Sequence, residues 1–91
     1  MPSIDIKRSH SRPLAEARKK VQHVAEHLAS KFDIQWRWEG NVLHFERSGV
    51  DGHIKVGAKQ VHVTAHLGFL LSALRGSVER EIHRYLDEEF D

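Results

Sequence analysis

The chain has 91 residues, and its 14 lysines and arginines nearly balance its 13 aspartates and glutamates, which leaves a formal net charge of +1. Domains that bind nucleic acid usually carry a clear basic excess, so this balance argues against a nucleic-acid partner. The chain has no cysteine, which excludes a disulfide framework, a thiol nucleophile and a thiolate metal site. The length predicts a single domain over residues 1–91.

No segment has the composition of an export signal or a membrane span. The first residues lack a basic stretch followed by an apolar one, which is the pattern of a secretory signal. No apolar run approaches the roughly 20 residues that cross a bilayer. We therefore expect a soluble, cytoplasmic protein with no membrane span.

The first third of the chain predicts a short strand followed by a long helix. Residues 3–7 alternate polar and apolar side chains, which is typical of a strand. Ser11 is a candidate N-cap, and Pro13 is tolerated only in a first helical turn. Residues 14–32 carry apolar side chains at spacings of three and four, which predicts an amphipathic helix.

Between residues 34 and 67 the apolar period changes to two. Four alternating segments are separated by short turns: 34–39, 42–47, 53–56 and 60–67. This pattern predicts an antiparallel meander with one apolar and one polar face. Residues 48–52 are expected to form a loop, in which Asp51 beside Gly52 acts as a turn former. The apolar face needs a cover, and the long helix has a matching stripe.

The last strand leads directly into an uncharged run at residues 67–74, Leu-Gly-Phe-Leu-Leu-Ser-Ala-Leu. A helix with one buried face would interleave charges every third or fourth residue. This run must therefore be buried on nearly all sides or contact a second surface. Gly76 then interrupts the helical pattern, so we expect a kink, or two helices with Ser77 capping the second, which ends near Phe90.

The predicted fold class is α+β, with element order β-α-β-β-β-β-α. An antiparallel meander sheet is packed by a long N-terminal helix and a kinked C-terminal helical region. This order resembles a reduced helix-grip arrangement, in which an antiparallel sheet wraps around a C-terminal helix. A likeness at the level of fold does not determine function.

Two sequence motifs resemble a known family. They are Phe-Glu-Arg-Ser-Gly-Val-Asp-Gly at residues 45–52 and the apolar run at residues 67–74, and the opening Ile-Asp-Ile with the later His-Ser agrees with them. Over almost the whole chain, the sequence resembles the small bacterial family of polyhydroxyalkanoic acid system proteins. The resemblance implies an association with synthesis and storage of polyhydroxyalkanoate, a polyester kept in cytoplasmic granules. It implies no set of catalytic residues.

The polar residues predict no catalytic, cofactor or metal site, and we do not expect an enzyme. Of the eight histidines, His62 and His66 lie about 13 Å apart along one strand, too far to share a metal ion. His44 is separated from both by the intervening strand. His23 and His27 lie one turn apart but lack a third ligand. We interpret the histidines as surface imidazoles.

The apolar residues therefore supply the candidate sites. The candidate contact residues lie in the uncharged run: Phe69, Leu70, Leu71 and Leu74. They would bind a polyhydroxyalkanoate granule, a granule-associated protein, or a second copy in a homodimer, unless the run simply fills the chain's own sheet. An alternative function is binding of a small acyl or hydroxyacyl group between sheet and helix. The candidate residues of that pocket are aromatic: Trp36, Trp38, Phe45 and Phe69.

Overall fold

The computed structural model describes residues 3–90, apart from the side chain of Leu70. The elements follow one another as β1 (Ser3–Ser9), α1 (Leu14–Phe32), β2 (Gln35–Glu39), β3 (Val42–Arg47), β4 (Val50–Val56), β5 (Gln60–Leu67), the 3-10 helix η1 (Phe69–Leu74) and α2 (Arg75–Phe90). The predicted α+β class and the predicted element order are confirmed.

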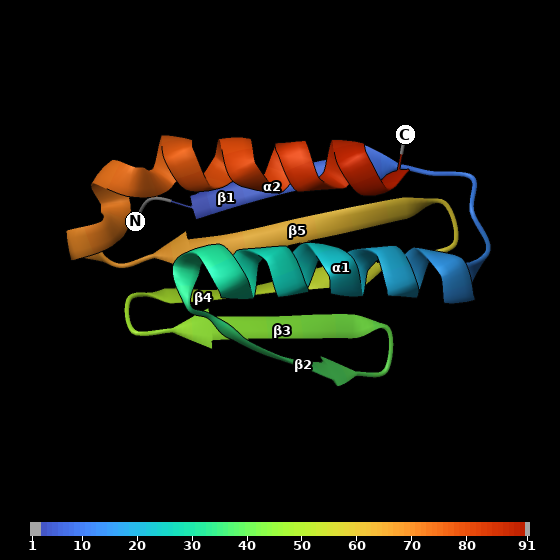
Figure 1. The fold of residues 1–91 in the computed structure, drawn as a ribbon, viewed down its shortest axis with the longest axis horizontal. Coiled ribbons are helices and arrows are strands. Elements are labelled where there is room, and N and C mark those ends of the chain that lie inside the picture. Colours follow the sequence, from blue (N-terminus) through green and yellow to red (C-terminus); the bar gives the residue numbers. More distant parts are fainter. Residues whose placement is uncertain (1–2, 91) are drawn as a thin grey trace.

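The five strands form one antiparallel sheet in the order β1-β5-β4-β3-β2. Strands β2 to β5 form the predicted meander, and β1 joins its far side by pairing with β5. Both helices lie on the same face of this sheet and run antiparallel to each other (Figure 1). Helix α1 packs on β2, β3 and β4, whereas α2 packs on β1. The opposite face of the sheet carries the polar side chains.

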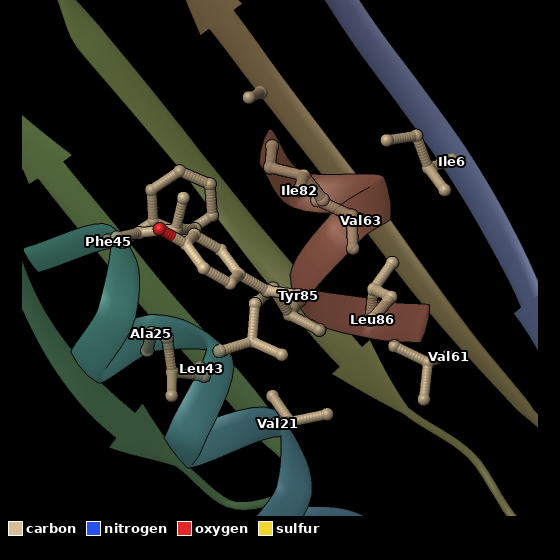
Figure 2. Close-up of a cluster of buried hydrophobic side chains, with 14 of the residues drawn as sticks. Ile6, Val21, Ala25, Leu43, Phe45, Val61, Val63, Ile82, Tyr85 and Leu86 are labelled. Carbon is tan, nitrogen blue, oxygen red and sulfur yellow. The ribbon is translucent and has the colours of Figure 1, made fainter. Parts of the chain in front are cut away.

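The core lies between the sheet and the two helices (Figure 2). One row of cross-strand partners, Leu43, Ile54, Val63 and Ile6, runs through four strands. The first three are fully buried and Ile6 is 5% exposed. Burying one such side chain contributes roughly 1.5–3 kcal/mol. The helices cover this row with buried side chains of their own, among them Val21, Ala25, Ile82 and Leu86.

Side-chain contacts repeat along the line where the two helices meet. They occur at four-residue intervals: Lys31 with Glu81, His27 with Tyr85, and His23 with Glu89. Lys31 Nζ donates to Glu81 Oε1 at 2.9 Å, and this hydrogen bond holds the pKa of Glu81 below its usual range. The rings of His27 and Tyr85 stack with their centroids 4.8 Å apart. The repeat fixes the antiparallel register of α1 against α2.

The predicted range of α1, residues 14–32, is confirmed, but the candidate N-cap Ser11 is wrong. The helix begins at Leu14, and Pro13 occupies the N-cap position with extended dihedrals and no side-chain cap. Ser11 lies too early in the chain to reach the first amide groups of the helix. At the other end, Asp33 adopts a left-handed conformation with φ of 58°, and its N–H bonds to Ala29 O at 2.9 Å. The chain thereby reverses into β2.

Of the two alternatives predicted at Gly76, the one in which Ser77 caps a second helix is wrong. Helix α2 begins at Arg75, so Gly76 and Ser77 lie in its first turn. The N–H of Arg75 already bonds to Ser72 O of the 3-10 helix, so α2 continues directly from η1 without a separate side-chain cap. The change from 3-10 to α geometry therefore falls at Leu74 and Arg75.

Strand β4 begins earlier than predicted, because residues 50–52 belong to it. Asp51 is a strand residue that faces Glu46 and His66, and is not a turn former. Gly52 lies opposite Phe45. A Cβ atom on Gly52 would lie 2.6 Å from Phe45 Cζ and 2.5 Å from Thr64 O. The position requires glycine because the Phe45 ring packs directly against the backbone.

We expect Gly52→Ala to destabilise the protein by about 1–3 kcal/mol, the usual cost of overpacking a core. The matched control is Gly76→Ala, since a Cβ there would meet nothing within 4 Å and alanine favours a helix by up to about 1 kcal/mol. Denaturant unfolding measures both changes. Equal stabilities of the two variants would contradict the proposed packing of Phe45.

Candidate functional site

The apolar run is divided between the core and the surface. Leu67, at the end of β5, is 1% exposed and belongs to the core. Gly68 is extended. The chain then forms η1 at the end of the sheet and continues from it into the first turn of α2 (Figure 1). Leu71 is half-buried, whereas Phe69 is 87% exposed and Leu74 is 48% exposed. Neither of the two outcomes predicted for the run applies to all of it.

The turn between β3 and β4 holds η1 in place. Gly49 in this turn has φ of 88°, and its carbonyl oxygen accepts a hydrogen bond from Gly68 N–H at 2.7 Å. A Cβ atom on Gly49 would lie 2.8 Å from Leu71 Cδ1. Glycine therefore satisfies two requirements here, a left-handed backbone and close packing under Leu71. The contact joins the two motifs, residues 45–52 and 67–74.

A small apolar hollow lies behind Leu71. It is bounded by the end of α1, the β3–β4 hairpin, η1 and α2, and its lining residues are Leu28, Phe32, Ile34, Phe45, Arg47, Val50, Leu67, Leu71, Leu74, Val78 and Ile82. Its volume is about 50 Å³, whereas ligand pockets usually measure at least roughly 300 Å³. In this conformation the hollow has no room for an acyl chain.

Only one of the four residues predicted to line a pocket borders this hollow, and that residue is Phe45. Phe69 is almost wholly exposed. Trp36 and Trp38 are half-buried on β2, at the edge of the sheet. Trp38 Nε1 donates to Gln22 Oε1 at 3.1 Å. The sequence did place both tryptophans on the apolar face, but it did not show that β2 is an edge strand.

The geometry of η1 separates its side chains. Residues three apart align along a 3-10 helix, and Leu71 and Leu74 both border the hollow. Phe69 is not part of the hollow. The side chain of Leu70, the fourth predicted contact residue, lies outside the described part of the structure. We call the three described side chains, Phe69, Leu71 and Leu74, the η1 patch.

The polar face of the sheet carries the second cluster of candidate residues. His44 and His53 are cross-strand partners whose ring centroids lie 6.2 Å apart. Burial, and next the charge of His44, lower the pKa of His53 from 6.5. His62 pairs with Asp5 on β1 and is separated from His44 by β4, as predicted. Within residues 3–90, no three histidine or carboxylate side chains are grouped to hold a metal ion.

We expect His44→Gln to raise the pKa of His53 part of the way towards 6.5, which a histidine NMR titration measures. Because folding lowers this pKa, the unfolded chain binds the proton more readily. The free energy of unfolding therefore does not depend on His53 well above pH 6.5, and it decreases as the pH falls below 6.5 and the unfolded chain takes up the proton first. An unchanged His53 pKa in the variant would show that the two rings do not interact.

The fold and the η1 patch define a small α+β protein with one covered sheet face and an exposed apolar 3-10 turn. Within residues 3–90, neither helix is long and apolar enough to cross a membrane. Comparison with known families matches residues 4–90 to the family described as "Putative polyhydroxyalkanoic acid system protein". The chain belongs to this family, and the resemblance seen in the sequence is confirmed. No curated protein and no solved structure gave a significant match.

Proposed function

We propose that the protein is a non-enzymatic accessory protein of polyhydroxyalkanoate metabolism that binds the storage granule in the cytoplasm through its η1 patch. Membership of the polyhydroxyalkanoic acid system family supports the metabolic setting. The observation that carries the proposed mode of contact is the exposure of Phe69. Its exposed fraction is 87%, whereas that of Phe45, in the core, is 4%.

The η1 patch is suited to bind an apolar surface. Isolated exposed apolar residues are common, but continuous apolar patches usually mark interaction sites. Here Leu74 is both half-exposed and part of the apolar hollow, so the exposed surface continues into it. Burying one large apolar side chain contributes roughly 1.5–3 kcal/mol. Phe69 and Leu74 together can therefore supply much of the affinity for a weak, reversible contact.

The backbone of η1 is already fixed before binding. The hydrogen bond from Gly68 N–H to Gly49 O and the packing of Leu71 on Gly49 hold the segment against the β3–β4 turn. A segment ordered in advance loses less conformational entropy when it binds. The same contacts keep Phe69 pointing away from the protein's own core.

We expect Phe69→Asp to reduce co-sedimentation of the protein with purified polyhydroxyalkanoate granules at least about tenfold, since it removes an apolar contact and adds a charge. The matched control is Leu14→Asp. Leu14 is 40% exposed and is the first residue of α1, and the start of this helix lies at the opposite end of the molecule from η1 (Figure 1). An aspartate there is compatible with the first turn of α1, so this variant is expected to bind granules normally.

Circular dichroism and melting temperature establish that both variants fold. Granules stripped of protein then distinguish a polymer surface from a granule-bound partner protein, because only polymer binding survives the stripping. If folded Phe69→Asp protein sediments with native granules as well as wild type does, the proposed role of the η1 patch is wrong.

A further inference from the structure

The outer edge of β2 is an unpaired strand edge. Among residues 3–90, β2 pairs only with β3 and ends the sheet. The other edge strand, β1, is flanked by α2, and Arg75 Nε donates to Ser3 O at 2.9 Å. Open edges favour pairing with another chain, and proteins usually protect them with lysine, proline or a bulge. The sequence of β2, Gln-Trp-Arg-Trp-Glu, has no lysine or proline, its pairing with β3 has no bulge, and its two charged residues, Arg37 and Glu39, have opposite signs.

The hairpin geometry shows which backbone groups are free. Gly40, with φ of 60°, and Asn41 form a two-residue turn, and Glu39 faces Val42 across it. The residues that flank such a turn exchange both hydrogen bonds, and alternate residues then point outwards. The N–H and C=O groups of Trp36 and Trp38 therefore point away from β3, towards the open edge.

The charged side chains of β2, Arg37 and Glu39, are complementary to those of a second copy of the same strand. We propose that two copies of the chain associate through their β2 edges in an antiparallel, two-fold pairing centred on Trp38. In this register Arg37 of each copy faces Glu39 of the other, and Trp38 faces Trp38. The side chains of Arg37 and Glu39 are 62% and 64% exposed on the polar face, so both are accessible to a second chain.

Other two-fold registers either oppose like charges or leave the charges without an opposite partner. Residues that face each other must lie on the same side of the sheet, so the axis must pass through a residue position. Centring the pairing on Arg37 places two guanidinium groups together, and centring it on Glu39 places two carboxylates together. Centring it on Trp36 leaves Arg37 opposite Gln35. Opposite charges directly across a strand pair stabilise it, and like charges destabilise it.

The apolar face supports the same register. Trp36 and Trp38 are only half-buried, because β2 lies at the edge of the layer covered by α1. In the proposed pairing Trp36 of each copy lies beside Gly40 in the β2–β3 turn of the other, and a Cβ position on Gly40 has no atom within 4 Å to obstruct the ring. The product is one continuous sheet of both copies, with all helices on one face. The η1 patch is a separate surface and takes no part in it.

Analytical ultracentrifugation over a wide concentration range tests the pairing. Wild type is expected to dimerise. Arg37→Glu and Glu39→Arg should each weaken the dimer at least about tenfold, because each places two pairs of like charges across the edge. Mixing these two variants should restore association, since each brings the charge that the other lacks. The control Lys55→Glu changes an exposed charge on the polar face of β4 and should leave the dimer unchanged.

Within one strand, Arg37 Nη2 and Glu39 Oε2 lie 3.4 Å apart, and the double variant Arg37→Glu with Glu39→Arg keeps this ion pair with its charges exchanged. It therefore protects the test against misfolding of the single variants. It should dimerise with itself but not with wild type, because the mixed pair again opposes like charges. A wild-type monomer at every concentration overturns the proposal. A dimer that ignores both single substitutions, or folded single variants that do not associate when mixed, overturns it as well. None of these results bears on granule binding by Phe69.

Discussion

Burial of the apolar face of the sheet under both helices is the constraint on which the rest of the structure depends. The face is continuous from β1 to β3 through Ile6, Val63, Ile54 and Leu43, and a single helix is too narrow to cover it. Helices α1 and α2 therefore share it, and their contacts at Lys31–Glu81, His27–Tyr85 and His23–Glu89 set their spacing. The opposite face stays polar and uncovered.

Sharing one face between two helices explains why η1 is exposed. To start α2 over β1, the chain must turn back from the end of β5, and η1 is the segment that makes this turn. The turn is fixed on Gly49, which directs Leu71 inwards and leaves Phe69 outside. The same division leaves β2 at the margin of the helical layer, with its tryptophans half-covered. Both proposed contact surfaces thus arise from one packing arrangement.

Most of the fold could be predicted from the sequence, because apolar periodicity reports local structure directly. The alternation in residues 34–67 identified the meander, and the three–four spacing identified both helices. Pairing of β1 with β5 depends on contacts distant in sequence, which periodicity does not encode. The candidate caps Ser11 and Ser77 were wrong because serine favours N-cap positions, while here the backbone forms its hydrogen bonds without them. The lack of charge singled out residues 67–74 in the sequence, but only three-dimensional packing shows that Phe69 is exposed and Leu67 is not.

The absence of cysteine allows a direct measurement at η1. Ala73 is exposed on η1, so a spin label on Ala73→Cys would report on the patch while Phe69 stays in place. Titrating this protein with polyhydroxyalkanoate granules should broaden the electron paramagnetic resonance spectrum and raise the accessibility of the label to oxygen. A label on Leu14→Cys at the far end should stay mobile. If the Ala73 label remains as mobile on granules as in solution, the η1 patch is not the granule contact.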